Sequence, residues 1–240
     1  MEWHRGRLAA FDVETTGPDP EHDRIVTAAV SLVGAGLPPE HHAWLVDPGV
    51  EIPAGAIAVH GITNEQVQAE GRDSAEAVEE IVALLAEQVG AEVPIVAFNA
   101  RFDVTILDRD ARRHGIAPLM DRVGGVERLL AIDPYVLDKQ FDRYRKGRRT
   151  LVAVCEHYEI PFEEAHVANA DALAAARVAF RIGSRIAELR ALDLATLHRE
   201  QVSWAATQAA QLQEYFQEQG RPERVEGAWP LVPAQLAVAA

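Results

Sequence analysis

The sequence predicts a mixed α/β fold on three observations. Its first third consists of short runs rich in apolar and β-branched residues, separated by Gly, Pro and Asp turns, a pattern typical of strands. From Ser74 onward, apolar residues recur at helical spacing. The middle of the chain then alternates strand, helix and strand with short connections, which is typical of parallel pairing. We therefore expect one mixed sheet flanked by helices.

Three antiparallel strands are expected first, at 8–13, 24–33 and 41–46. The Gly-Ala-Gly at 34–36 joins the second to the third closely enough for a hairpin. An amphipathic helix follows, preceded by Asp73 and Glu76, which stand three residues apart as in a capping box. The later elements expected are a buried strand at 93–98, a helix at about 100–115, a strand at 128–132, and helices at about 134–144, 151–158 and 169–189.

A compact domain is expected over residues 1–190, with a helical extension and tail at 191–240. Six glutamines lie between Gln201 and Gln219, and Gly220 is a good stop for the helix that contains them. The larger apolar side chains of the extension either pack back on the domain, mediate self-association or bind a polymerase. Packing is favoured, because clustered aromatic side chains usually find burial. These side chains are Trp204, Leu212, Tyr215 and Phe216.

Charge and cysteine content exclude several classes of protein. The 23 Lys and Arg residues stand against 37 Asp and Glu, and the net charge of −14 disfavours simple wrapping of nucleic acid on a basic surface. The single cysteine excludes an intrachain disulfide and a site with several thiolate ligands, and favours a reducing, cytoplasmic setting. The longest apolar run, at 25–33, is too short to cross a membrane.

One basic segment stands out from this acidic chain. Five cations lie within seven residues, at Arg143, Arg145, Lys146, Arg148 and Arg149. The segment either follows the phosphates of a nucleic acid strand or is a solvated loop at the end of the preceding helix, and the sequence favours neither.

The segment FDVETTG at 11–17 carries the first chemical signal. Residues two apart on a strand point to the same face, so Asp12 and Glu14 project together while Val13 enters the opposite layer. Two carboxylates so close repel each other, and one pKa rises unless a cation shares the site. The alternative is that the pair only solvates a strand end, since short motifs have many false positives.

Three further residues favour a catalytic role for Asp12 and Glu14 over the solvation of a strand end. Asp103 falls in the first turn of the helix that follows the strand at 93–98, at the edge where open α/β sheets place ligands. His166 and Asp171 stand five apart and do not share a helical face, so His166 is expected on a loop and Asp171 in the next helix's first turn. Separately, Asp103 could complement a helix dipole and His166 could be a capping residue.

Together these motifs resemble the DnaQ-like exonucleases of the DEDDh class, which includes RNase T and the proofreading subunit of the bacterial replicative polymerase. The matching segments are FDVETTG at 11–17, VHGIT at 59–63, FNARFD at 98–103 and HVANAD at 166–171, within a resemblance that spans residues 7–190. The resemblance implies an RNase H-like fold, with a five-stranded sheet of three antiparallel and two parallel strands. It also implies release of 5′-monophosphates from 3′ ends with two divalent ions.

In this family the metal ligands correspond to Asp12, Glu14, Asp103 and Asp171, and the general base corresponds to His166. Four carboxylates without a thiolate suit Mg²⁺ or Mn²⁺ far better than zinc. The resemblance also implies substrate-binding roles for four further residues. These are Thr15, Thr16, His60 and Phe102, whose alternatives are turn formation, a loop cap and core packing.

The favoured function is a metal-dependent 3′-to-5′ exonuclease on single-stranded or frayed DNA ends, acting in proofreading or repair. One alternative is an exoribonuclease similar to RNase T or oligoribonuclease, because the metal chemistry does not read the 2′-OH. Another is a non-catalytic scaffold module that binds a polymerase through its C-terminal segment. A two-carboxylate glycosidase leaves Asp103, His166 and Asp171 without a role.

Overall fold

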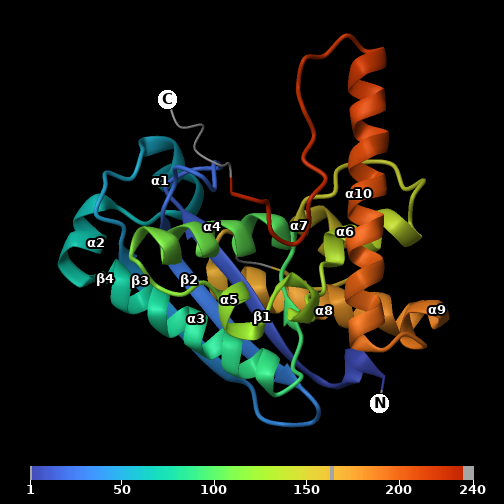
Figure 1. Ribbon diagram of the computed structural model, residues 1–240, viewed down its shortest axis with the longest axis horizontal. Coiled ribbons are helices and arrows are strands. Elements are labelled where there is room, and N and C mark those ends of the chain that lie inside the picture. Colours follow the sequence, from blue (N-terminus) through green and yellow to red (C-terminus); the bar gives the residue numbers. More distant parts are fainter. Residues whose placement is uncertain (1, 163–164, 235–240) are drawn as a thin grey trace.

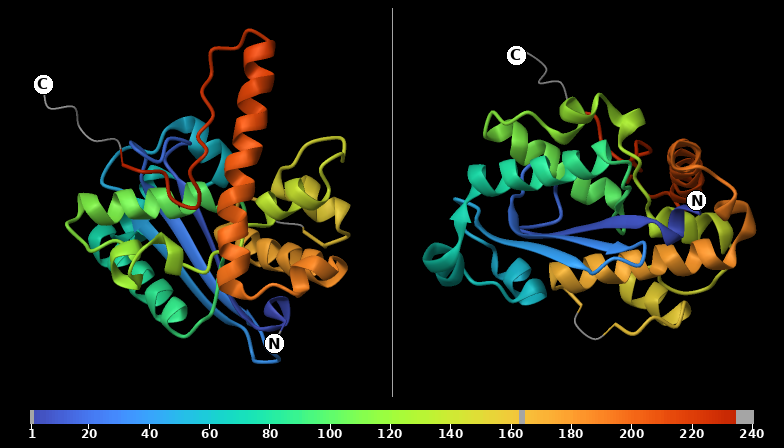
Figure 2. Two further views of the ribbon diagram at one scale, coloured as in Figure 1. Left: turned by 45° about the vertical axis from the view of Figure 1, so that its right-hand side comes forward. Right: turned by 90° about the horizontal axis from the view of Figure 1, so that it is seen from below.

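The computed structural model describes residues 2–162 and 165–234, and within them a five-stranded sheet lies between helices (Figures 1 and 2). The strand order is β4-β3-β2-β1-β5. β1 pairs antiparallel with β2 and β2 with β3, whereas β5 runs parallel to β1 and β4 parallel to β3. The mixed sheet is therefore confirmed. The strands are β1 (Arg7–Thr15), β2 (Ile25–Gly34), β3 (Glu40–Asp47), β4 (Arg72–Asp73) and β5 (Ile95–Val96).

The helices of the described chain surround this sheet and extend beyond it. They are α1 (Ala54–His60), α2 (Asn64–Glu70), α3 (Ser74–Gly90), α4 (Ala100–Arg113), α5 (Leu119–Val123), α6 (Pro134–Phe141), α7 (Leu151–His157), α8 (Ala168–Arg185), α9 (Ala187–Arg190) and α10 (Leu194–Glu218), with 3-10 turns at Trp3–Arg5 and Val126–Arg128. The Asp73 cap is confirmed, because its side chain accepts a hydrogen bond from Glu76 N at 3.1 Å. In the right-hand view of Figure 2, α3 and α8 cover opposite faces of the sheet.

The alternation of β1 explains this layering. Ala9, Phe11 and Val13 enter the core shared with α3 and α4, while Leu8 and Ala10 enter the second core shared with α8. Positions two apart share a face, so the carboxylates that continue the Leu8 and Ala10 series point toward the α8 side. The strand thus carries its polar end to the start of α8.

The hairpin between β2 and β3 is confirmed at the predicted Gly-Ala-Gly. Gly34 has φ +95°, and a Cβ there would lie 2.3 Å from the Gly6 carbonyl oxygen. Only glycine satisfies both the left-handed backbone and the close approach.

The strand expected at 128–132 is wrong. Val126–Arg128 is a 3-10 turn, and only Ile132 pairs with the sheet, through one parallel bridge to Val96. Side chains of α10 take the place of a ladder: Ala131 N donates to His198 Nδ1 at 3.2 Å, and Gln201 Nε2 donates to the Ala131 carbonyl at 2.9 Å. The fifth strand is instead β4, which has only two residues and no pattern to reveal it.

Several boundaries also differ from the sequence prediction. The strand expected at 93–98 is reduced to β5, and the helix expected at 134–144 ends at Phe141. The helix expected at 169–189 breaks at Ile186, whose ψ of 109° is extended, to give α8 and α9. Helices α1, α2 and α5 were not predicted, because each is too short for a clear helical period.

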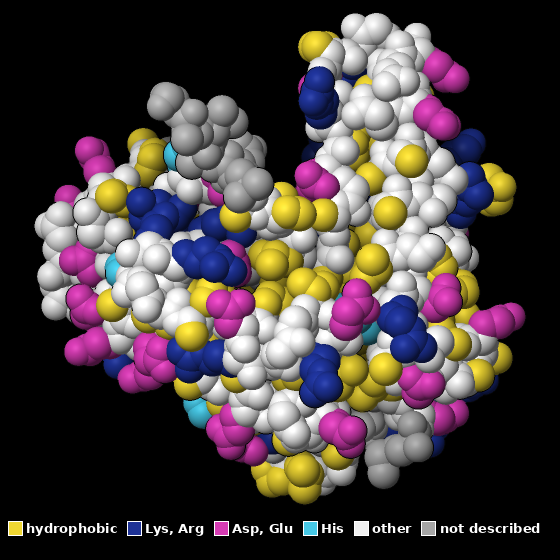
Figure 3. Space-filling model, viewed as in Figure 1, with side chains coloured by type: hydrophobic (Ala, Val, Ile, Leu, Met, Phe, Trp, Pro, Cys, Tyr) yellow, Lys and Arg dark blue, Asp and Glu magenta, His cyan; other side chains and the backbone are white. Residues whose placement is uncertain are grey.

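The C-terminal segment packs its first half on the domain and projects with its second. Trp204 packs against both main cores, whereas Leu212 and Tyr215 are 37% and 53% exposed. In Figure 3, α10 stands out from the body, with apolar side chains gathered where the two meet. The chain then returns along α10, in red in Figure 1, and Val232 N donates to Thr105 Oγ1 at 3.1 Å.

None of the helices described here combines the length and the apolar character that a membrane span requires.

Candidate active site

The end of β1 brings two carboxylates to the α8 face of the sheet. Asp12 and Glu14 are partly buried there, and Val13 between them is buried in the opposite core, as predicted. A register shift between Glu14 and Thr15 ends the regular pairing with β2. Such irregularities re-aim side chains next to active sites.

Asp103 lies beside this pair, in the first turn of α4, as predicted. Its Oδ1 accepts a hydrogen bond from Val13 N at 3.2 Å, and the side chain is 4% exposed. The turn into α4 passes through Asn99, which has φ +64°. The buried Asp133 holds this turn, accepting from Asn99 N at 2.9 Å and from Ala100 N at 3.0 Å.

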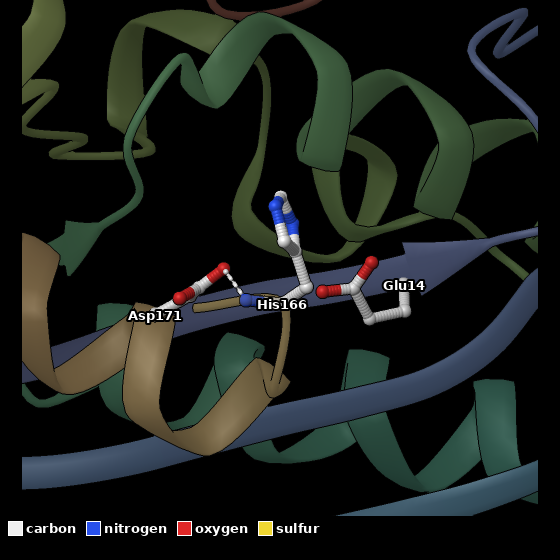
Figure 4. A group of neighbouring side chains, drawn as sticks. All are labelled: Glu14, His166 and Asp171. Carbon is white, nitrogen blue, oxygen red and sulfur yellow. Dashed lines mark hydrogen bonds between the residues drawn. The ribbon is translucent and has the colours of Figure 1, made fainter. Parts of the chain in front are cut away.

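Asp171 and His166 approach from the other side of the cleft. Asp171 lies in the first turn of α8 and His166 on the loop before it, as predicted. His166 N donates to Asp171 Oδ2 at 3.2 Å, which holds the loop residue at φ +67° (Figure 4). One ligand atom each from Glu14, His166 and Asp171 lies within 4.8 Å of the other two.

These residues line an open cleft of about 480 Å³. Asp12, Glu14, His166 and Asp171 belong to its wall, and Asp103 stands behind it through the bond to Val13. The rest of the wall is Val13, Phe98, Asn99, Phe102, Tyr135, Arg149 and Leu151. The structure therefore brings together five residues that span most of the sequence.

Burial, with mutual repulsion added at Asp12 and Glu14, raises the pKa values of the carboxylates in this cleft. Burial first, and then the charges of Asp103, Asp171 and Glu14, raise the pKa of Asp12 well above its ordinary value. Burial and Asp171 raise the pKa of Glu14 to about 7, and burial raises that of Asp171 to about 6. Within the described chain, none of the four carboxylates forms an ion pair with Lys or Arg.

An unused buried oxygen points the same way. Asp171 Oδ1 is buried and has no hydrogen-bond partner among the described residues. A buried carboxylate oxygen without a donor is costly, and a divalent cation would satisfy it. The donor set of carboxylate oxygens fits a hard divalent ion.

Two of the predicted substrate residues use their hydroxyl groups in the turn after β1. Thr15 Oγ1 donates to the Gly17 carbonyl at 2.7 Å, and Thr16 Oγ1 donates to Asp23 Oδ1 at 2.8 Å. Neither residue belongs to the cleft wall, so the turn-forming role is the one that the contacts describe.

The other two predicted substrate residues lie at different depths. His60 ends α1, where its Nδ1 accepts from Ile62 N at 3.1 Å and its Nε2 is buried without a partner in the described chain. Burial lowers the pKa of His60, opposed by the Thr15 carbonyl and aided by the nearby His166. Phe102 lines the cleft and also packs against the core.

Residues 9–179 match the RNase T family model, which is described as an exonuclease. The match covers more than half of the chain. The chain belongs to this exonuclease family. The resemblance to DnaQ-like exonucleases and the RNase H-like fold are thereby confirmed.

The relatives and neighbours of this exonuclease agree with that assignment. It is 28% identical over 179 residues to the PolC-type DNA polymerase III of Lacticaseibacillus paracasei, which covers 75% of this chain and 11% of that protein. The chain thus spans about a tenth of the length of that curated relative. A solved structure of E. coli Exonuclease I with a dT13 oligonucleotide matches 73% of this chain and 40% of that one, with 19% identity and a TM-score of 0.59.

A second solved structure contains a metal ion. It is the zinc-bound form of the E. coli Exonuclease I complex with single-stranded DNA, at 21% identity and a TM-score of 0.63, covering 77% of this chain and 42% of that one. At this identity the likeness shows the fold.

Two residues at the exonuclease cleft were not predicted from the sequence: Tyr135 lines the cleft, and Asp133 supports the turn into α4. Arg149, predicted only as part of the basic segment, also lines the cleft. Asp133 is 1% exposed and caps α6 by accepting from Tyr135 N at 2.9 Å. The Asp-Pro pair at 133 and 134 signals that cap, but no local signal links it to Asn99, because the contact is made across 34 residues.

The basic segment is divided by its contacts. Arg145 donates to the buried Asp138 at 2.8 Å, and Arg149 is also bonded to that carboxylate. Arg143, Lys146 and Arg148 remain exposed. Two of the five cations therefore fold inward as structural ion pairs, and three are available to a ligand.

Trp229 is expected to matter for stability more than any exposed residue of the extension. It is 4% exposed, and its Nε1 donates to Asp133 Oδ2 at 3.0 Å. Trp229→Ala should lower the free energy of unfolding by about 3 to 5 kcal/mol in urea denaturation, while Trp229→Phe should lose only about 1 to 2. Tyr215→Ala, at a 53% exposed site, is the control. Equal stabilities for Trp229→Ala and the control would contradict this packing.

Without divalent ions, the exonuclease is expected to become less stable as the pH rises from about 4 to 7. The folded-state pKa values of about 7 for Glu14 and about 6 for Asp171 exceed the ordinary values of 4.5 and 3.8. The native state therefore binds more protons than the unfolded state in this window, and the free energy of unfolding falls as they are lost. We expect a loss on the order of 2 kcal/mol, after allowance for solvent screening.

Urea denaturation in chelator at pH 5 and pH 7.5 measures this loss. The double variant Glu14→Gln/Asp171→Asn lacks both titrating carboxylates. The difference in pH dependence between the parent and this variant therefore gives their contribution. A pH dependence as steep in the double variant as in the parent would assign the effect elsewhere.

Proposed function

We propose that the chain is a 3′-to-5′ exonuclease that hydrolyses the terminal phosphodiester of DNA 3′ ends and releases 5′-monophosphates. The observation that carries the proposal is the convergence of Asp12, Glu14, Asp103 and Asp171 on one cleft without a paired cation in the described chain, beside an exposed histidine. Four repelling carboxylates weaken a fold, and function is the usual reason for keeping them.

In the proposal, Asp12, Glu14, Asp103 and Asp171 hold two divalent ions, Mg²⁺ or Mn²⁺. Bound there, the ions would activate a water molecule and stabilise the departing 3′ oxygen. Carboxylate oxygens are hard ligands, and they favour Mg²⁺ and Mn²⁺ over zinc. The zinc-bound relative makes zinc the necessary third metal in any test.

His166 is proposed to accept the proton of the attacking water. Its exposed ring stands at the cleft, and its backbone is fixed to Asp171 through the bond from His166 N. A neutral imidazole accepts a proton at physiological pH, whereas a carboxylate that binds a metal is a poor base. Thr15, Thr16, His60 and Phe102 are proposed to hold the terminal nucleotide.

DNA is the favoured substrate, in proofreading or repair. The named relative is a DNA polymerase III, and the named neighbour was solved with a dT13 oligonucleotide. An exoribonuclease is the second candidate, because the same carboxylates cleave either backbone. The exposed Leu212 and Tyr215 on α10 support the further proposal that the extension binds a polymerase or a second copy.

The test compares 5′-labelled and 3′-labelled DNA and RNA oligomers with Mg²⁺, Mn²⁺, Zn²⁺ or chelator, with Asp12→Asn as the blank. We expect a ladder that shortens from the 3′ end, only with a metal and fastest on DNA. Shortening from the 5′ end would contradict the polarity, and intact oligomers with every metal would contradict the enzymatic function. Faster loss of RNA would select the exoribonuclease.

A further inference from the structure

Three neighbouring hollows with shared lining residues lie between the cleft carboxylates and the C-terminal helix. The cleft shares Asn99 and Tyr135 with a hollow of about 110 Å³ beside α6. That hollow shares Lys139 and Gln208 with a third one of about 410 Å³, and Arg149 lines both the cleft and the third hollow. The shared walls make one path that leads from the carboxylates to α10, which lies beside α6 in Figure 1.

The walls of this path are positively charged, although the whole chain has a net charge of −14. Lys139 and Arg143 line it and form no ion pair within the described chain. Its acidic lining among the described residues, outside the catalytic cleft, is Asp133, which is already occupied by four hydrogen-bond donors. Burial, and then the charges of Arg149 and Arg101, lower the pKa of Lys139, while the charge of Asp133 opposes them.

The opposite wall offers uncharged donors and acceptors. Gln208 and Gln211 face the third hollow from α10, together with Thr207. Gln208 uses its Nε2 on the Val136 carbonyl at 3.1 Å, and Gln211 is exposed with no side-chain bond in the described chain. Side-chain amides and neighbouring cations can both contact the phosphates of a nucleic acid strand, and such contacts do not depend on its sequence.

We infer that this groove between α6 and α10 binds the nucleotides that precede the scissile bond in a single strand, with Lys139 and Arg143 on the phosphates and Gln211 on the facing wall. The inference rests on the proposed exonuclease function and adds a binding site outside the catalytic carboxylates. The volumes of about 480 and 410 Å³ are within the range of small-molecule sites, and the hollow of about 110 Å³ between them is smaller. The eight residues of α6 rise about 12 Å, roughly two nucleotides of an extended strand.

The test measures kcat/KM for a ten-nucleotide single strand and for a dinucleotide, which is too short to fill the groove. In the double variant Lys139→Gln/Arg143→Gln, the ratio of the two values is expected to fall about tenfold at low salt. The salt dependence for the longer strand should also flatten by about one to two units of slope, as two phosphate contacts are lost. Arg5→Gln/Arg199→Gln removes two exposed cations elsewhere and is the matched control.

A second variant tests the α10 wall without touching a packed side chain. Gln211→Glu places a negative charge in the groove and should lower the same ratio about threefold to tenfold. Gln217→Glu makes the same change six residues further along α10, at another exposed position outside the groove, and should keep the parent's ratio. Gln211→Glu decides the matter if the double variant does not fold.

The possible outcomes distinguish failure of the groove proposal from failure of the proposed exonuclease function. A parent that cleaves both substrates, with the parent's ratio retained in both groove variants, would overturn the groove and leave the exonuclease function intact. A parent that cleaves neither substrate would overturn both. An equal fall in the ratio for Gln211→Glu and Gln217→Glu would show a general charge effect and would also overturn the groove.

Discussion

Asp12→Asn is expected to lower the exonuclease rate by about 10³- to 10⁵-fold and to raise the thermal stability of the metal-free protein. The rate falls because the central carboxylate of the proposed metal site is lost, and each tenfold corresponds to about 1.4 kcal/mol of activation free energy. Stability rises because burial, and then the charges of Asp103, Asp171 and Glu14, disfavour the ionised form of Asp12 and raise its pKa. An uncharged amide of the same shape removes this repulsion.

Three measurements check the change together: single-turnover rate, Tm in chelator, and the rise in Tm on adding Mg²⁺. We expect a lower rate, a higher Tm in chelator and a smaller rise with Mg²⁺, because a ligand that binds the native state stabilises it less when its site is damaged. Asp121→Asn, at an exposed position of α5, is the control and should change none of the three. A rate within tenfold of the parent would remove Asp12 from the site.

Local periodicity predicts the parts of this site that lie on strand and helix ends. The period-2 alternation places Asp12 and Glu14 on one face, and the start of α4 places Asp103 in its first turn, as the structure has them. His166 was correctly separated from the α8 helix because five residues do not return to one helical face. What periodicity does not contain is the convergence itself, which depends on β1 lying between β2 and β5.

The wrong strand at 128–132 and the unrecognised role of Asp133 both result from contacts between distant parts of the chain. The backbone at 128–132 satisfies its polar groups through His198 and Gln201 of α10, so an apolar run that resembles a strand need not join a ladder. The same holds for Asp133, whose donors come from Asn99, Ala100, Tyr135 and Trp229. The contacts of Ala131 with His198 and Gln201, and of Asp133 with Trp229, join residues 67, 70 and 96 positions apart, so a local window of sequence does not contain them.

The C-terminal helix α10 contributes both to the fold and to the proposed groove. Its first half completes the fold by bonding residues 131 and 133, and its next turns supply the wall with Gln208 and Gln211. A helix fixed at one end by buried amides holds its exposed face in a defined place, which a flexible tail would not do. The predicted boundary at residue 190 remains a prediction.

The second large effect is expected at His166. His166→Ala should lower the single-turnover rate by about 10² to 10⁴, the usual share of general-base catalysis, while the rise in Tm with Mg²⁺ stays close to that of the parent. The metal site is retained because Asp171 and Glu14 are intact, and Asp171 Oδ2 accepts its bond from the backbone N of residue 166, which alanine keeps. The substitution thus separates proton transfer from metal binding.

The pH–rate profile gives the decisive readout for that role. A protonated imidazole cannot accept the proton of water, so the parent should lose activity toward acid pH, and His166→Ala should lose the part of that limb due to the imidazole. His22→Ala is the control, because the His22 side chain is 86% exposed. We expect this variant to keep the rate and the pH–rate profile of the parent. Equal single-turnover rates for His166→Ala and the parent would contradict the role of His166 as general base. The next candidate would then be His60, whose Nε2 is buried without a partner among the described residues.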